Sequence, residues 1–161
     1  MNTSEGLKKE SVWNYPRPPR IEMSSRLVQV IFNNETISET NRSLRVLETS
    51  HPPTYYIPSE DVQQQLLIRS ESKSYCEFKG VATYYTIQVK GKVSEHAAWS
   101  YHSPNPGYES IKDYIAFYPG RVDACYVDGE RVKAQVGDFY GGWITSEIEG
   151  PFKGGSGTNG W

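Results

Sequence analysis

The stretch that decides the fold is VATYYTIQVKGKVSEHAAWSY, residues 81–101. Residues 81–90 are rich in β-branched and aromatic side chains, which fit a pleated and half-buried surface. The Gly91-Lys92 pair offers a tight turn, and a second run of strand-forming residues follows over residues 93–101. We therefore predict a long antiparallel hairpin.

Shorter segments of the same kind lie on both sides of this hairpin. Alternation and β-branched residues predict further strands at 26–32, 36–40, 43–48, 114–118 and 123–127. The turn-forming pairs Asn33-Asn34 and Asp128-Gly129 follow two of these strands directly. Many short strands joined by tight turns indicate a mainly β fold, either a compact curled antiparallel sheet or a small barrel.

One or two short helices complete the predicted fold. Ser59 can cap a helix by accepting a hydrogen bond, and Glu60 and Asp61 suit the positive N-terminal end of that helix. We predict a helix of two to three turns over residues 59–68 and a single helical turn at residues 110–113.

The length of 161 residues is that of one domain. We divide the chain into an N-terminal Pro-rich arm, residues 1–25, a β-rich core, residues 26–150, and a Gly-rich C-terminal tail, residues 151–161. The prolines impose extended backbone on the arm, whereas the glycines leave the tail conformationally free. A domain of this size needs no disulfide bonds to be stable, because it buries roughly 68–70% of its unfolded surface.

Charge and cysteine content limit the classes of function. The net charge is −2 and the isoelectric point about 5.9, so we expect no general binding to nucleic acid. Residues 1–10 lack the apolar segment of a signal peptide, and no apolar run approaches the ~20 residues that span a bilayer. Cys76 and Cys125 form no C-x-x-C pair. We expect a cytoplasmic protein that does not bind membranes and keeps both thiols reduced.

The first candidate site lies where the strand at residues 43–48 ends. Glu48 takes an inward position where a hydrophobic residue would be expected, and His51 follows just before the Pro52-Pro53 break. If the chain turns there, the carboxylate and the imidazole can meet and perform acid–base chemistry. The alternative is an exposed strand end with an incidental histidine.

The second candidate is a thiol beside an ammonium group. Cys76 and Lys79 lie three residues apart, just before Gly80. A nearby ammonium lowers the pKa of a thiol and makes it a better nucleophile. The alternative is a cysteine that packs as a small hydrophobic residue. Glu48, His51 and Cys76 could also supply three metal ligands, although their spacing is not that of a typical zinc site.

Aromatic residues supply the candidates for ligand contacts. Tyrosine accounts for 12 of the 161 residues, and each tyrosine brings an apolar ring with a polar tip. Tyr56, Tyr84, Trp99 and Tyr101 could line one cleft beside the catalytic candidates. Packing in the core of the sheet explains the same residues.

Several separate motifs occur in an order that resembles one known family. They are LETSHPPTYYIP at residues 47–58, DV at 61–62, CEFKG at 76–80, AWSY at 98–101 and AFY at 116–118. The chain resembles, over roughly residues 26–130, the bacterial domain of unknown function 427 family, also labelled nucleotidyltransferase-like. The arm and the tail are similar to those of a longer subgroup, and Glu77 stands where a proline is common. The resemblance implies a compact, mainly β domain in bacteria, and it implies no established reaction.

Three hypotheses about function follow. The first is a small-molecule-binding β domain that either only binds or also uses acid–base or thiol chemistry at Glu48, His51, Cys76 and Lys79. The second is a non-catalytic interaction or dimerisation module, with a homodimer as its simplest form. The third is a metal-assisted hydrolase or nucleotidyltransferase, although the sequence has no Asp-x-Asp pair and no phosphate-binding G-x-x-x-x-G-K-[ST] loop. The sequence leaves the ligand and any cofactor unspecified.

Overall fold

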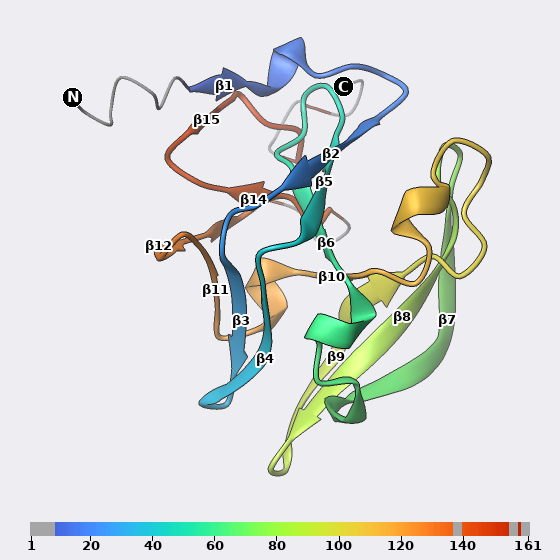
Figure 1. Ribbon diagram of the computed structural model, residues 1–161, viewed down its shortest axis with the longest axis vertical. Helices are drawn as coiled ribbons and strands as arrows, with labels where there is room; N and C mark the ends of the chain where they lie inside the picture. The colour runs from blue at the N-terminus through green and yellow to red at the C-terminus, as the bar shows by residue number, and fades with distance from the viewer. Residues whose placement is uncertain (1–8, 137–139, 155–157, 159–161) are drawn as a thin grey trace.

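The computed structural model describes residues 9–136, 140–154 and 158. This part of the chain is mainly β, and its helical segments are 3₁₀ turns of three residues each. A seven-stranded and a four-stranded antiparallel sheet hold most of its strand residues (Figure 1). The prediction of a mainly β, antiparallel fold is therefore confirmed. No helix in the described ranges has the length and hydropathy needed to cross a membrane.

The larger sheet has the strand order β2-β5-β6-β10-β9-β8-β7. Its strands are, in that order, β2 (Arg20–Ser24), β5 (Ser43–Leu47), β6 (Thr54–Ile57), β10 (Ile115–Phe117), β9 (Lys92–Ser100), β8 (Gly80–Val89) and β7 (Leu67–Cys76). Over the described residues, the sheet is open at its two edges, β2 and β7. Of the two predicted forms it is thus the curled sheet and not the closed barrel; Figure 1 shows the long strands β7, β8 and β9 bending together.

The smaller sheet has the order β12-β11-β3-β4. Its strands are β12 (Glu130–Arg131), β11 (Ala124–Val127), β3 (Val28–Phe32) and β4 (Glu35–Thr40). Two pairs of short strands complete the structure: β1 (Glu10–Ser11) runs parallel to β15 (Ile148–Glu149), and β13 (Lys133–Ala134) runs antiparallel to β14 (Trp143–Ile144). The 3₁₀ turns are η1 (Val12–Asn14), η2 (Ser59–Asp61), η3 (Gln64–Leu66), η4 (Glu109–Ile111) and η5 (Pro119–Arg121).

Three hairpins have turns in which both central residues adopt positive φ. These central pairs are Asn33-Asn34, Lys90-Gly91 and Asp128-Gly129. Such turns match the right-handed twist of the flanking strands, and Asn, Asp and Gly tolerate the required conformation. The hairpin predicted at residues 81–101 is confirmed as β8 and β9, with the turn one residue earlier than the sequence indicated.

The helix predicted over residues 59–68 is wrong. The chain makes the two separate turns η2 and η3, Val62 between them is extended and bridges to β4, and β7 begins at Leu67. Gln63 donates from its backbone N–H and from its side-chain amide to carbonyl groups of β4. These tertiary hydrogen bonds replace the bonds that a continuous helix would have made within itself.

Apolar side chains cover both faces of the seven-stranded sheet. The layer between the two sheets includes Val30, Ile57, Phe117 and Trp143. Trp143 is fully buried, and its indole N–H donates to the carbonyl of Phe117 at 3.0 Å. The opposite face carries a second cluster that contains most of the aromatic candidates, together with Leu44, Val46 and Ile111. The candidate site lies on this second face.

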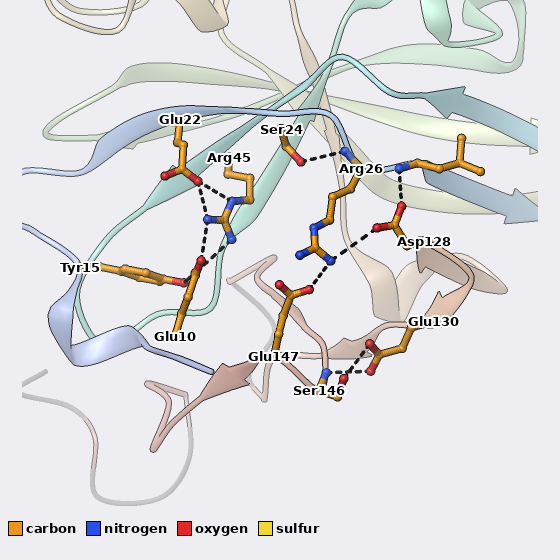
Figure 2. A network of polar contacts seen from close by, with 11 residues as sticks. Glu10, Tyr15, Glu22, Ser24, Arg26, Arg45, Asp128, Glu130, Ser146 and Glu147 are labelled. Atoms are coloured by element: carbon orange, nitrogen blue, oxygen red, sulfur yellow. Dashed lines mark hydrogen bonds and ion pairs between the residues drawn. The ribbon is translucent and has the colours of Figure 1, made fainter. Parts of the chain in front are cut away.

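Part of the predicted arm packs against the body of the same chain. Val12 and Tyr15 form a small core with Leu47 and Ile148, and β2 forms an edge of the large sheet. A polar network around Arg45 joins β1, β2 and β5 (Figure 2). Of the predicted tail, only residues 151–154 and 158 belong to the described residues, and the terminal Trp161 lies outside them.

Candidate functional site

A cavity of about 390 Å³ opens on the second face of the large sheet. All eight residues that the sequence predicted for a site line this cavity: Glu48, His51, Tyr56, Cys76, Lys79, Tyr84, Trp99 and Tyr101. They come from the end of β5, from β6, from the connection between β7 and β8, and from the β8–β9 region. The volume lies within the range of small-molecule sites, near its lower end.

Glu48 and His51 lie on the turn that follows β5. Ser50 adopts φ of 69° and is buried, and the His51 N–H donates to the Glu48 carbonyl at 3.1 Å. The two side chains nevertheless have different partners, because Glu48 accepts a hydrogen bond from Arg17 Nε at 3.0 Å. The structure therefore brings Glu48 and His51 to one cavity without the carboxylate–imidazole contact that the sequence suggested.

The protonation of His51 follows from its contacts. Its Nδ1 lies 2.8 Å from the carbonyl oxygen of Thr49, and a carbonyl can only accept, so Nδ1 carries the proton. Burial lowers the pKa of His51 below its ordinary value, although the hydrogen bond to Thr49 opposes this effect. The imidazole is therefore neutral at pH 7, and Nε2 holds a lone pair that can accept a proton or a hydrogen bond.

Aromatic side chains form much of the cavity wall. Trp99 Nε1 donates to the Tyr56 hydroxyl at 3.1 Å, and the rings of Trp99 and Tyr118 lie 4.6 Å apart. The hydroxyls of Ser74 and Tyr84 are 2.7 Å apart. Burial raises the pKa of Tyr56 well above its ordinary value, so this group is a neutral hydroxyl at pH 7. The wall thus combines apolar rings with hydroxyl groups.

Cys76 and Lys79 stand at the connection between β7 and β8. Gly80 has φ of 113°, and a side chain at this position would crowd Asn105, whose backbone N–H donates to the Lys79 carbonyl at 2.9 Å. The Cys76 thiol forms no disulfide, and it lies close enough to the Lys79 ammonium to affect the pKa of that group. The predicted proximity of a thiol and an ammonium group is therefore present in the structure.

Lys79 carries an enclosed positive charge. Burial alone would lower the pKa of Lys79, but its neighbours Tyr56, Cys76 and Glu48 raise it above its ordinary value. The group is therefore an ammonium ion at pH 7. Its Nζ lies 6.0 Å from the centre of the Tyr101 ring, and no carboxylate in the described part of the chain forms an ion pair with it.

Glu48, His51 and Cys76 do not form a metal site. Among the described residues, no group of three or more histidine, cysteine or acidic side chains is arranged to hold a metal ion. The three side chains nevertheless line the same cavity. The metal-ligand arrangement that the sequence left open is therefore not present in the described residues.

Sequence reasoning missed the part of the cavity rim that the two ends of the chain supply. Arg17 comes from the arm, and Gln135, Tyr140, Gly141 and Lys153 come from the last part of the chain. The Lys153 N–H donates to the Ser50 carbonyl at 2.7 Å, and Gln135 Nε2 donates to the Lys153 carbonyl at 2.7 Å. The only sequence signal was the Gly141-Gly142 pair, because a side chain at Gly141 would collide with Trp99.

A comparison with known protein families finds one family whose model matches this chain. The family model described as a domain of unknown function, DUF427, and labelled NTP_transf_9 matches residues 20–128, more than half of the chain. The chain belongs to the DUF427 family. No curated protein matches the chain. The DUF427 match includes every strand of the seven-stranded sheet on which the cavity lies. The lining residues Arg17, Gln135 and Lys153 lie outside the matched residues.

Proposed function

We propose that this DUF427 chain is a small-molecule-binding domain and that its ligand occupies the 390 Å³ cavity. The observation that carries the proposal is the convergence of polar groups on one concave site. Lys79, His51 and the tyrosines come from distant segments of the chain and line one cavity. Enclosed ionisable groups in a cleft lined with aromatic rings are typical of ligand sites.

The shape of the site supports binding over a purely structural role. A core that served packing alone would be filled by apolar side chains, because an enclosed charge or an open cavity lowers stability. Here both features occur together. A side chain at Gly141 would collide with Trp99, so this glycine lets the backbone lie directly against the Trp99 ring in the cavity lining.

Acid–base chemistry on the bound molecule is the second candidate, and His51 favours it. The hydrogen bond from Nδ1 to Thr49 fixes the tautomer, which leaves Nε2 as the basic atom. A neutral imidazole at pH 7 is a competent general base. Cys76 is the corresponding candidate for thiol chemistry, since its thiol lies beside the Lys79 ammonium in the cavity wall.

A pair of matched variants tests whether the cavity binds small molecules. Ala82 and Val81 are neighbours on β8, but Ala82 lines the cavity whereas Val81 is exposed. Ala82→Phe should fill the cavity, and Val81→Phe should add the same ring outside it. The measurement is a thermal-shift screen of a small-molecule library against the wild type and both variants. A ligand at 100 times its Kd should raise the Tm by roughly 5–10 °C.

Supporting hits should stabilise the wild type and Val81→Phe but not Ala82→Phe. The Trp99 indole N–H, observed by NMR in the wild type, should shift on titration with the same compounds, which provides a readout independent of the variants. Hits that stabilise Ala82→Phe equally, or that leave the Trp99 signal unchanged, would show that this cavity is not the binding site.

A further inference from the structure

We infer that the ligand of this cavity is a small monocarboxylate with a flat apolar body, and that its carboxylate pairs with the ammonium group of Lys79. The inference rests on the proposed binding function and adds the chemical class of the ligand. It is carried by three features of the cavity: the ammonium group of Lys79, the net charge of the lining residues, and the aromatic wall.

Lys79 is the first feature. Its side chain is half-buried, and the ammonium group is enclosed by Cys76, Tyr56 and the Tyr101 ring. Within the described ranges Lys79 has no ion pair with a carboxylate. Glu48 acts on the Lys79 charge without forming an ion pair with it, because its carboxylate binds Arg17 at 3.0 Å. An anionic group on a ligand would supply the missing partner.

The remaining charged side chains limit the charge of that ligand. Arg17 is paired with Glu48 at 3.0 Å, and Lys153 Nζ donates to the carbonyl of Thr158 at 3.0 Å while it lies 5.8 Å from the centre of the Tyr140 ring. The charged residues that line the cavity in the described part of the chain are three cations, Arg17, Lys79 and Lys153, and two anions, Glu48 and Glu77, so one positive charge is in excess. A carboxylate is a monoanion and balances it, whereas a phosphate dianion would leave an enclosed negative charge.

The aromatic wall determines the shape of the ligand. Trp99 is held by its hydrogen bond to Tyr56 and by its contact with the tilted ring of Tyr118, and Tyr84 is held by its hydrogen bond with Ser74. These side chains offer fixed ring faces and edges, which favour a planar partner at defined positions. A volume of about 390 Å³ suits a compact molecule and not a nucleotide with several phosphates.

The experiment uses three probes that share one ring: benzoate, benzamide and phenyl phosphate. Calorimetric titrations at pH 7 are run on the full-length wild type, on Lys79→Met and on Lys133→Met, since Lys133 is exposed and does not line the cavity. Benzoate should bind the wild type at least about 10-fold more tightly than benzamide, as expected for a charge-assisted hydrogen bond. Phenyl phosphate, a dianion at this pH, should bind more weakly than benzoate.

The variants should separate charge from shape. Lys79→Met should lose about 10-fold or more in benzoate affinity and keep its benzamide affinity within about twofold, and Lys133→Met should behave as the wild type. Equal binding of benzoate and benzamide, or no benzoate binding at millimolar concentrations, would overturn the inference. The comparison of benzoate with benzamide on the wild type tests the inference even if Lys79→Met fails to fold. Neutral compounds that bind the wild type but not Ala82→Phe would in that case still support the proposed binding function.

Discussion

Arg45 is the side chain whose removal should show most directly how the arm is attached to the core. It is 7% exposed and donates to the carboxylates of two other strands (Figure 2). Arg45 Nη1 lies 3.2 Å from Glu10 Oε1, and Arg45 Nε lies 3.2 Å from Glu22 Oε1. The Tyr15 hydroxyl donates to the same carboxylate of Glu10 at 2.6 Å. One guanidinium therefore connects β1, β2 and β5.

The substitution Arg45→Met keeps an unbranched apolar side chain and removes the charge. Removal of one partner from a fully buried ion pair lowers the free energy of unfolding by roughly 3–5 kcal/mol. The side chains of Glu10 and Glu22 are 39% and 43% exposed, so water can hydrate the carboxylates that lose their partner. We therefore expect a smaller loss of about 1–2 kcal/mol. For a domain of this size the Tm should fall by roughly 3–6 °C.

The loss should depend on pH. Burial opposes the ionisation of Glu10, but the hydrogen bonds from Arg45 and Tyr15 outweigh it and hold the pKa of Glu10 below its ordinary value of 4.5. A carboxyl group whose pKa is lower in the folded state stabilises the protein above the unfolded pKa, and this contribution is lost as the pH falls through the folded value. The difference between wild type and Arg45→Met should thus be full at pH 7 and shrink below about pH 4.5.

The assay is urea unfolding followed by tryptophan fluorescence at pH 7 and at pH 3. Arg20→Met is the matched control. The Arg20 side chain is 54% exposed, and its nearest distance to Glu22 is a long 3.7 Å, so this ion pair contributes little to stability. The control should stay within about 0.5 kcal/mol of the wild type. The reasoning would be refuted if Arg45→Met were as stable as Arg20→Met, or if its deficit were as large at pH 3 as at pH 7.

Four further predictions follow from burial and hydrogen bonding. Burial lowers the pKa of His51, so its NMR titration midpoint should lie below the ordinary 6.5. Burial raises the pKa of Cys125, so a thiol reagent should modify Cys76 in the native protein and Cys125 only after unfolding. Trp143→Phe should lower the free energy of unfolding by about 2–3 kcal/mol, measured in urea, because it leaves a void and an unpaired carbonyl. Deletion of residues 1–19 should lower it by about 3 kcal/mol or more, because it exposes the small core that the arm shares with β5.

Each of these predictions has a contradicting result. A His51 midpoint above 6.5, equal reaction of both native thiols, or a Trp143→Phe variant as stable as the wild type would contradict the first three. For the deletion, light scattering should be measured beside the Tm. Loss of self-association with an unchanged Tm would instead support the interaction module, with the arm as its contact element.

The sequence predicted well those strands and turns whose conformation depends on residues close together in the chain. The β-branched and aromatic residues of segment 81–101 located β8 and β9, and the pairs Asn33-Asn34 and Asp128-Gly129 located two hairpin turns. Positive φ at both turn positions is a property of these residues themselves. The helix predicted at residues 59–68 failed for the complementary reason, because Gln63 is bound by β4, which is distant in sequence. The same error concealed the start of the ten-residue strand β7.

For the candidate site, too, the sequence indicated the residue types and the tertiary structure decided their arrangement. The sequence by itself determined the family motifs, the mainly β class and the residue types that could perform chemistry at Glu48, His51, Cys76 and Lys79. Only the tertiary structure decided that these groups and four aromatic residues face one cavity, and that both ends of the chain supply its rim. The physical reason is that the pairing of β5, β6, β10, β9 and β8 sets which distant side chains meet. Pairing between strands depends on the whole folded sheet and not on the spacing of residues along the chain.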